Sequence, residues 1–119
     1  MDPENIQKER HINRYEDSIR NRIAELLLHE IRDPRIPQLT SVTKVVLSQD
    51  LGTAQVFVAL PSSKEDPSSI IQILEKSAPY LKKRLSNTLK MKRTPKLTFL
   101  IDDDLGVENR LNIMLRNLG

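Results

Sequence analysis

The side chains most able to do chemistry in this sequence are basic, and they are concentrated in one segment. From Lys76 to Ile101 there are eight Lys or Arg residues and no Asp or Glu, whereas the rest of the chain carries eleven basic and sixteen acidic residues. The formal net charge of +3 therefore conceals a cationic block in an otherwise acidic chain. Such a block attracts phosphate whatever the nucleotide sequence. A solvated helix face is the alternative interpretation.

The position of this block along the predicted elements favours phosphate binding. The pattern predicts two helices within Ser68 to Lys90, joined at Ser77-Ala78-Pro79, because Pro suits the first turn of a new helix. Small side chains at the joint and the N–H groups of the second helix would favour an anion. An ordinary helical hairpin with a proline kink remains the alternative. The candidate RNA-binding residues are Lys76, Ser77, Ala78, Pro79, Lys82, Lys83, Arg84, Lys90, Lys92, Arg93 and Lys96.

Other residues with chemical potential have simpler explanations. Asp102-Asp103-Asp104 could bind a hard cation, but carboxylates before a helix also cap its N–H groups. His11 and His29 are eighteen residues apart on one predicted helix, with no serine or carboxylate arrangement that makes a catalytic pair. Gly52 fits a turn, since no glycine-rich phosphate-binding pattern surrounds it. With no Cys, disulfides and thiolate metal sites are excluded. We expect no enzyme activity.

Two tyrosines and two aliphatic residues are candidates for contacts with RNA or with a partner protein. Tyr15 lies on the apolar stripe of the first helix and is expected in the core, whereas Tyr80, beside the junction, is the better candidate for stacking on a base. Leu28 and Ile113 fall off the apolar stripes of their helices. They are either ordinary exposed residues or part of a partner surface.

The elements that must position these residues follow from periodicity and turn signals. Apolar residues spaced by three or four predict a helix from His11 to Arg32, which Pro34 ends. Runs rich in β-branched residues predict strands at 41–48 and 54–60, joined as a hairpin by a turn that contains Asp50 and Gly52. A third strand is expected at Lys96–Ile101, and a last helix after Asp104.

The predicted order is α-β-β-α-α-β-α, with a three-stranded sheet packed against helices in an α+β fold. We expect one domain over residues 11–119, because 119 residues suit one core, and a flexible N-terminus over residues 1–10. The N-terminus has no apolar signal sequence, and no apolar run approaches the roughly 20 residues that span a bilayer. A cytoplasmic protein without a membrane partner is therefore expected.

The chain resembles bacterial ribosome-binding factor A from about Arg14 to Leu118. The order and spacing of several short motifs carry the resemblance. These are Leu27-Leu28-His29-Glu30-Ile31-Arg32-Asp33-Pro34-Arg35, Val42-Thr43-Lys44-Val45, Ser48-Gln49-Asp50-Leu51, Ala54-Gln55-Val56-Phe57-Val58, Leu81-Lys82-Lys83-Arg84-Leu85, Thr94-Pro95-Lys96-Leu97-Thr98-Phe99 and Asp102-Asp103-Asp104.

The resemblance implies a type II KH-like domain in which an interrupted helix replaces the Gly-x-x-Gly loop. It implies a cytoplasmic factor that binds the immature 30S subunit and its 16S rRNA, and we expect the protein to be a monomer. Such a factor assists late maturation, including 5′-end processing, supports growth in the cold, and leaves with the help of a GTPase in some bacteria. It also implies no catalytic residues, cofactor or metal. One departure is Ser77-Ala78-Pro79, where the family typically has Ala-x-Gly, because Pro fixes φ and lacks an N–H donor.

Two other classes of function remain open at this stage. A protein-interaction module without RNA binding would use the hairpin edge or Leu28, and its binding would be insensitive to salt. A metal-dependent nuclease would use Asp102 to Asp104, and its RNA cleavage would require a divalent ion. RNA binding predicts an affinity for small subunits that falls steeply with salt.

Overall fold

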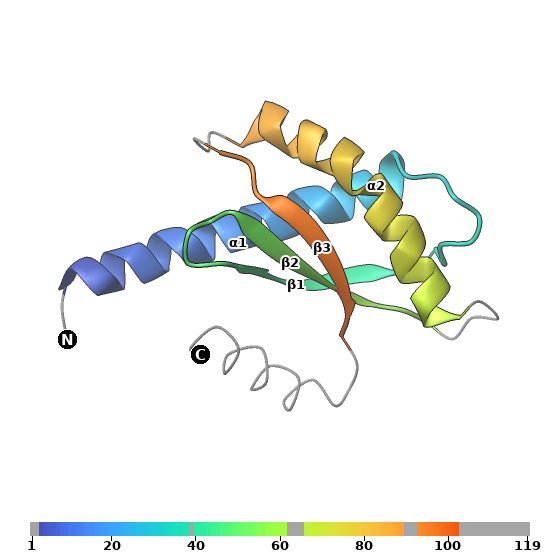
Figure 1. Cartoon of the computed structure of the whole chain (residues 1–119), viewed down its shortest axis with the longest axis horizontal. Helices are drawn as coiled ribbons and strands as arrows, with labels where there is room; N and C mark the ends of the chain where they lie inside the picture. Colours follow the sequence, from blue (N-terminus) through green and yellow to red (C-terminus); the bar gives the residue numbers. More distant parts are fainter. Residues whose placement is uncertain (1–2, 39, 62–65, 90–92, 103–119) are drawn as a thin grey trace.

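The computed structural model describes residues 3–38, 40–61, 66–89 and 93–102. It has two helices and three strands in the order α1 (Pro3–His29), β1 (Ser41–Leu47), β2 (Thr53–Ala59), α2 (Pro67–Thr88) and β3 (Lys96–Ile101) (Figure 1). The expected α+β class and all three strands are confirmed, with the strand boundaries displaced by no more than one residue. The helix expected after Asp104 lies outside the described residues.

The sheet has the order β1-β2-β3. β1 and β2 form the predicted antiparallel hairpin, in which Val45 pairs with Val56, and β3 lies parallel to β2, with Phe99 beside Val56. Parallel neighbours need a long crossover connection, and α2 provides it. This crossover brings the start of β3 back toward the hairpin turn, where the Lys96 N–H donates to the Gly52 carbonyl at 2.9 Å.

Asp50 and Gly52 lie in the turn of the hairpin, as predicted. The Asp50 carboxylate accepts hydrogen bonds from the Ser48 hydroxyl at 2.7 Å and from the Gly52 N–H at 2.9 Å. The residue with a positive φ is Leu51, at 60°, and not Gly52. This conformation is uncommon for a non-glycine residue. Since the Leu51 side chain packs against the core, burial of its apolar surface offsets the backbone strain.

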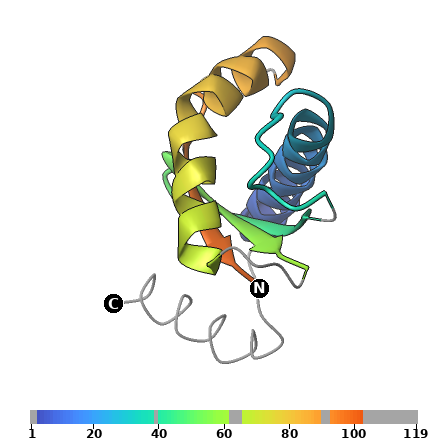
Figure 2. The same ribbon diagram turned by 90° about the vertical axis from the view of Figure 1, so that its right-hand side faces the viewer.

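The core lies between the two helices and one face of the sheet (Figure 2). Its helical side chains have the spacing expected of apolar stripes. The most deeply buried helix and strand residues include Ile19, Ile23 and Leu26 of α1, Ala54, Val56 and Val58 of β2, and Ile70, Leu74, Leu81 and Leu85 of α2. Tyr15 is only partly buried, although it packs against this core as predicted. Within the described ranges, no helix is long and apolar enough to cross a membrane.

Helix α1 is longer at its start and shorter at its end than predicted. It begins at Pro3, so the predicted start at His11 is wrong, and residues 3–10, expected as a flexible N-terminus, belong to the helix. Pro is well suited to a first helical turn, and the polar residues that follow it are mostly good helix formers. The helix ends at His29, where the Leu26 carbonyl accepts the last helical bond from the Glu30 N–H and also a bond from the Ile31 N–H five residues on, which departs from the α-helical pattern.

Helix α2 is one continuous helix with Pro79 inside it, so the predicted division into two helices is wrong. The order of the described elements is therefore α-β-β-α-β. A proline inside a helix removes a hydrogen bond and disfavours the helix by about 3 kcal/mol. Continuity is maintained because Leu74 before Pro79 and Leu81 after it are both fully buried in the same core. The helix accommodates the proline by bending midway along its length (Figure 2).

Helix α2 begins one residue before the predicted start at Ser68. Asp66 occupies the N-cap position and Pro67 the first helical position. The Asp66 carboxylate, however, makes no capping hydrogen bond. Its backbone carbonyl instead accepts the N–H groups of Ser69 and Ile70.

Candidate nucleic-acid interface

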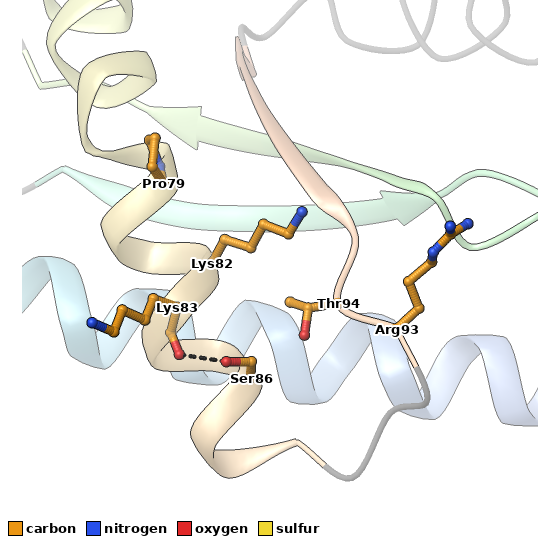
Figure 3. Close-up of a pocket in the computed structure, with 6 residues that line it drawn as sticks. All are labelled: Pro79, Lys82, Lys83, Ser86, Arg93 and Thr94. Carbon is orange, nitrogen blue, oxygen red and sulfur yellow. Dashed lines mark hydrogen bonds between the residues drawn. The ribbon is translucent and has the colours of Figure 1, made fainter.

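A depression of about 420 Å³ lies between the second half of α2 and the chain that enters β3 (Figure 3). Pro79, Lys82, Lys83 and Ser86 of α2 line one side, and Arg93 and Thr94 line the other. Four of the predicted site residues, Pro79, Lys82, Lys83 and Arg93, are thus brought together. The fold therefore places on one surface cations that are ten or more residues apart in the sequence.

The buried face of α2 determines where its lysines point. Leu81 and Leu85 are fully buried, so the helical period leaves Lys82, Lys83 and Ser86 on the solvent side. Lys82 extends toward the strand entrance, and Lys83 points to the other side of α2 (Figure 3). Within the described parts of the chain, neither lysine has a carboxylate partner at ion-pair distance. Their charges are available to an external anion.

The arginine on the other side of the depression lies near an acidic residue. Arg93 is directed toward the hairpin turn (Figure 3). Hydrogen bonds from Ser48 and the Gly52 N–H lower the pKa of Asp50, and the charge of Arg93 lowers it further. The basic segment therefore has an acidic neighbour in the folded protein, because the fold brings Asp50 close to Arg93.

The junction residues do not form the anion site that the sequence suggested. A continuous α2 has no helix N-terminus at Pro79, so its backbone has no free N–H groups there to offer phosphate. Ser77 donates its hydroxyl to the Ile73 carbonyl at 3.2 Å, an interaction that often accompanies a helix bend. Ala78 packs against the core. Binding in this region would depend on cationic side chains.

Arg84 points away from the depression, although it follows Lys83 directly. Its guanidinium forms an ion pair with Glu30, with 3.2 Å between Nε and Oε1. The Tyr80 hydroxyl donates to the same carboxylate at 2.9 Å. The Tyr80 hydrogen bond, followed by Arg84, lowers the pKa of Glu30, and the same bond raises the pKa of Tyr80. Arg84 and Tyr80 thus connect α2 to the end of α1.

The remaining candidates are dispersed. Lys76 is exposed on α2 and Lys96 on β3, but neither lines the depression. Lys90 and Lys92 lie outside the described residues. Ser86 and Thr94 line the depression and were not predicted. Ser86 could have been found from its spacing, since it lies one helical turn after Lys82 and Lys83.

The acidic cluster is described only at its first member. The Asp102 carboxylate accepts the Thr43 hydroxyl at 2.6 Å, and the Asp102 N–H donates to the Val58 carbonyl at 2.8 Å. Asp103 and Asp104 lie outside the described residues. In the part of the chain that the structure describes, no three His, Cys, Asp or Glu residues are grouped so that they could hold a metal ion.

These observations define a class: a small α+β protein that presents cationic side chains beside a bent helix. The profile of the ribosome-binding factor A family matches residues 11–115. Ribosome-binding factor A of Synechocystis sp. is 34% identical over 110 residues, which cover 92% of this chain and 83% of that protein. The chain therefore belongs to the ribosome-binding factor A family.

Solved structures agree with this assignment. The crystal structure of ribosome-binding factor A from Thermus thermophilus has a TM-score of 0.67 and 26% identity, covering 76% of this chain and 94% of that one. A second Thermus thermophilus structure, a homology model fitted into the cryo-EM map of a complex with the 30S subunit, has a TM-score of 0.57 and 27% identity. It covers 71% of this chain and 88% of that one. The fold is thus shared with the family.

Proposed function

We propose that this protein binds the immature 30S ribosomal subunit and contacts its 16S rRNA through the depression between α2 and the start of β3. The observation that carries the proposal is that Lys82 and Lys83 of α2 and Arg93 before β3 line the same depression, although they come from separate segments. Lysines such as Lys82 and Lys83, which form no ion pair with any described residue, attract backbone phosphates without reading the sequence. The 30S complex of the Thermus relative supports the choice of subunit.

The mechanism follows from binding alone. A protein that binds one rRNA conformation more tightly than others shifts the rRNA toward that conformation. In this way it would assist late maturation, including 5′-end processing of 16S rRNA, and support growth in the cold. We further propose a KH-like fold of type II over residues 11–119, a monomeric cytoplasmic state and release by a GTPase. The protein would need no catalytic residue, cofactor or metal.

Cosedimentation with immature and mature 30S subunits over a range of salt concentrations tests this function. Each phosphate contact contributes about 0.7 to 0.9 to the slope of log affinity against log salt. The double variant Lys82→Gln/Lys83→Gln should therefore lower the slope by about 1.4 to 1.8 and weaken binding at low salt. Arg14→Gln/Lys44→Gln, which removes two exposed charges away from the depression, is the matched control. Equal slopes for the two double variants would refute the assignment of this surface.

A further inference from the structure

A second depression, on the other helix, shares no residue with the cationic one. It is a groove of about 790 Å³ between the end of α1 and the loop that follows it. Its walls are mainly apolar. The residues that line it are Ala24, Leu27, Leu28, Ile31, Arg32, Asp33, Pro34, Ile36, Pro37, Gln38 and Thr40. The proposed contact with rRNA leaves this groove unexplained.

The most unusual residue of the groove is Leu28. Its side chain is 70% exposed, whereas its helix neighbours Ile23 and Leu26 are at most 1% exposed. A single exposed leucine is ordinary, but this one continues an apolar wall with Ala24, Leu27 and Ile31. Ala24, Leu27 and Leu28 lie on one face of α1, as on a helix that packs against another helix, and Ile31 follows just beyond the end of that helix. A contiguous apolar surface of this kind is typical of a protein-binding site.

The charged residues at the groove, Arg32 and Asp33, indicate which kind of charge a partner would need to carry. Asp33 is already neutralised, because its two oxygens accept the Arg35 guanidinium at 3.0 and 2.7 Å, and its pKa is lowered to about 2. Arg32 is exposed, and no carboxylate of the described residues lies at ion-pair distance from it. The groove therefore presents one available positive charge beside an apolar wall.

This combination disfavours two other occupants. A strand of RNA would need several cations or a stacking ring, and the groove has one available cation and no aromatic side chain among its lining residues. In a two-fold dimer the same groove would face itself, and its one carboxylate, Asp33, is already paired with Arg35, so the opposing groove would offer Arg32 no available acidic partner. An apolar helix with an acidic side chain at its margin satisfies both the wall and Arg32.

We propose that this groove binds an amphipathic helix of a protein on the small ribosomal subunit, with a carboxylate of that helix paired to Arg32. The inference rests on the proposed function, because the subunit supplies the partner. The protein would thus hold the subunit by two surfaces, one that attracts phosphate and one that buries apolar side chains. Only the first surface should respond strongly to salt.

Substitution of Leu28 tests the groove directly. Leu28→Asp should weaken binding to purified 30S subunits about tenfold, since a leucine buried at an interface is lost and a charge is placed against an apolar stripe. The weakening should persist at high salt, and the salt slope should match that of the parent. Ser18→Asp, at an exposed position earlier on α1, adds the same charge away from the groove and should bind as the parent does. Because Leu28 is exposed, the thermal unfolding of the Leu28→Asp variant should be unchanged.

A photo-crosslinking amino acid at position 28 identifies what lies there. On 30S subunits it should form an adduct with a ribosomal protein, and Arg32→Glu should abolish that adduct while Arg32→Lys retains it. Crosslinks to 16S rRNA alone, or self-association of the free protein that Leu28→Asp abolishes, would overturn the proposal.

The two proposals fail separately. Parent-like binding by Leu28→Asp together with a reduced slope for the Lys82 and Lys83 variant would refute the groove and leave the rRNA surface intact. The reverse result would refute the rRNA surface and leave the groove.

Discussion

Pro79 should make the protein less stable than it could be, because it lies inside a continuous helix. A proline in a helix interior is about 3 kcal/mol less favourable than alanine. Proline also lowers the conformational entropy of the unfolded chain, which stabilises the folded state by up to about 1 kcal/mol and offsets part of this difference. The side chain is exposed on α2, so its removal leaves no cavity in the core. Pro79→Ala should therefore raise the free energy of unfolding by about 2 kcal/mol.

Denaturant unfolding monitored by circular dichroism measures this change. Pro79→Gly is the informative comparison, because glycine is about 1 kcal/mol less favourable than alanine in a helix. The order of stability should be alanine, then glycine, then the parent proline. An unfolding free energy of Pro79→Ala equal to or below that of the parent would refute the reasoning. It would mean that the bend is required by packing around Leu74 and Leu81 rather than imposed by the proline.

The same substitution should affect binding in the opposite direction. Pro79 lines the cationic depression, and the bend sets the direction of the helical turn that carries Lys82 and Lys83. A straighter α2 would move both lysines relative to Arg93. Pro79→Ala should therefore bind 30S subunits more weakly although it is more stable.

Two carboxylates should give stability profiles with opposite dependence on pH. Burial raises the pKa of Glu16, although its carboxylate accepts a hydrogen bond from the Leu47 N–H at 2.8 Å. The stability that Glu16 contributes is therefore present at low pH and is lost as pH rises through the pKa of the folded state. Glu16→Gln keeps an acceptor without the charge and should raise the melting temperature at pH 7 but not at pH 3; equal shifts at both values would contradict this. Arg35 lowers the pKa of Asp33 to about 2, so the stability that Asp33 contributes is present above about pH 4 and is lost as pH falls through about 2. Asp33→Asn should lower the melting temperature at pH 7 and have little effect near pH 1, which thermal scans at both values check.

Local patterns were sufficient to predict the strands and most of the core. Lys96–Ile101 was predicted at its observed boundaries, because Thr94-Pro95 prevents an earlier start and the run is rich in apolar residues. Ile19 and Ile23 have the spacing of one helical face, and both are buried. The parallel pairing of β2 with β3 could not be read from either strand, since it depends on the path of α2.

The prediction failed where tertiary packing overruled a local signal. Pro79 is a strong helix breaker, but burial of Leu74 and Leu81 on either side of it keeps α2 in one piece. The same limit applies at the hairpin turn. No local signal indicated the positive φ of Leu51, whose side chain packs against the core.

Charge in sequence and charge in space differ most at Arg84. In the sequence Arg84 completes a basic triplet with Lys82 and Lys83, and all three were assigned to one surface. On the helix, successive residues differ by about 100° in direction, so three adjacent cations cannot share a face. Arg84 instead meets Glu30, fifty-four residues earlier, and is neutralised there. A segment without acidic residues can therefore offer an external anion fewer cations than its sequence contains. Which cations stay unpaired depends on the acidic residues that other elements bring next to them.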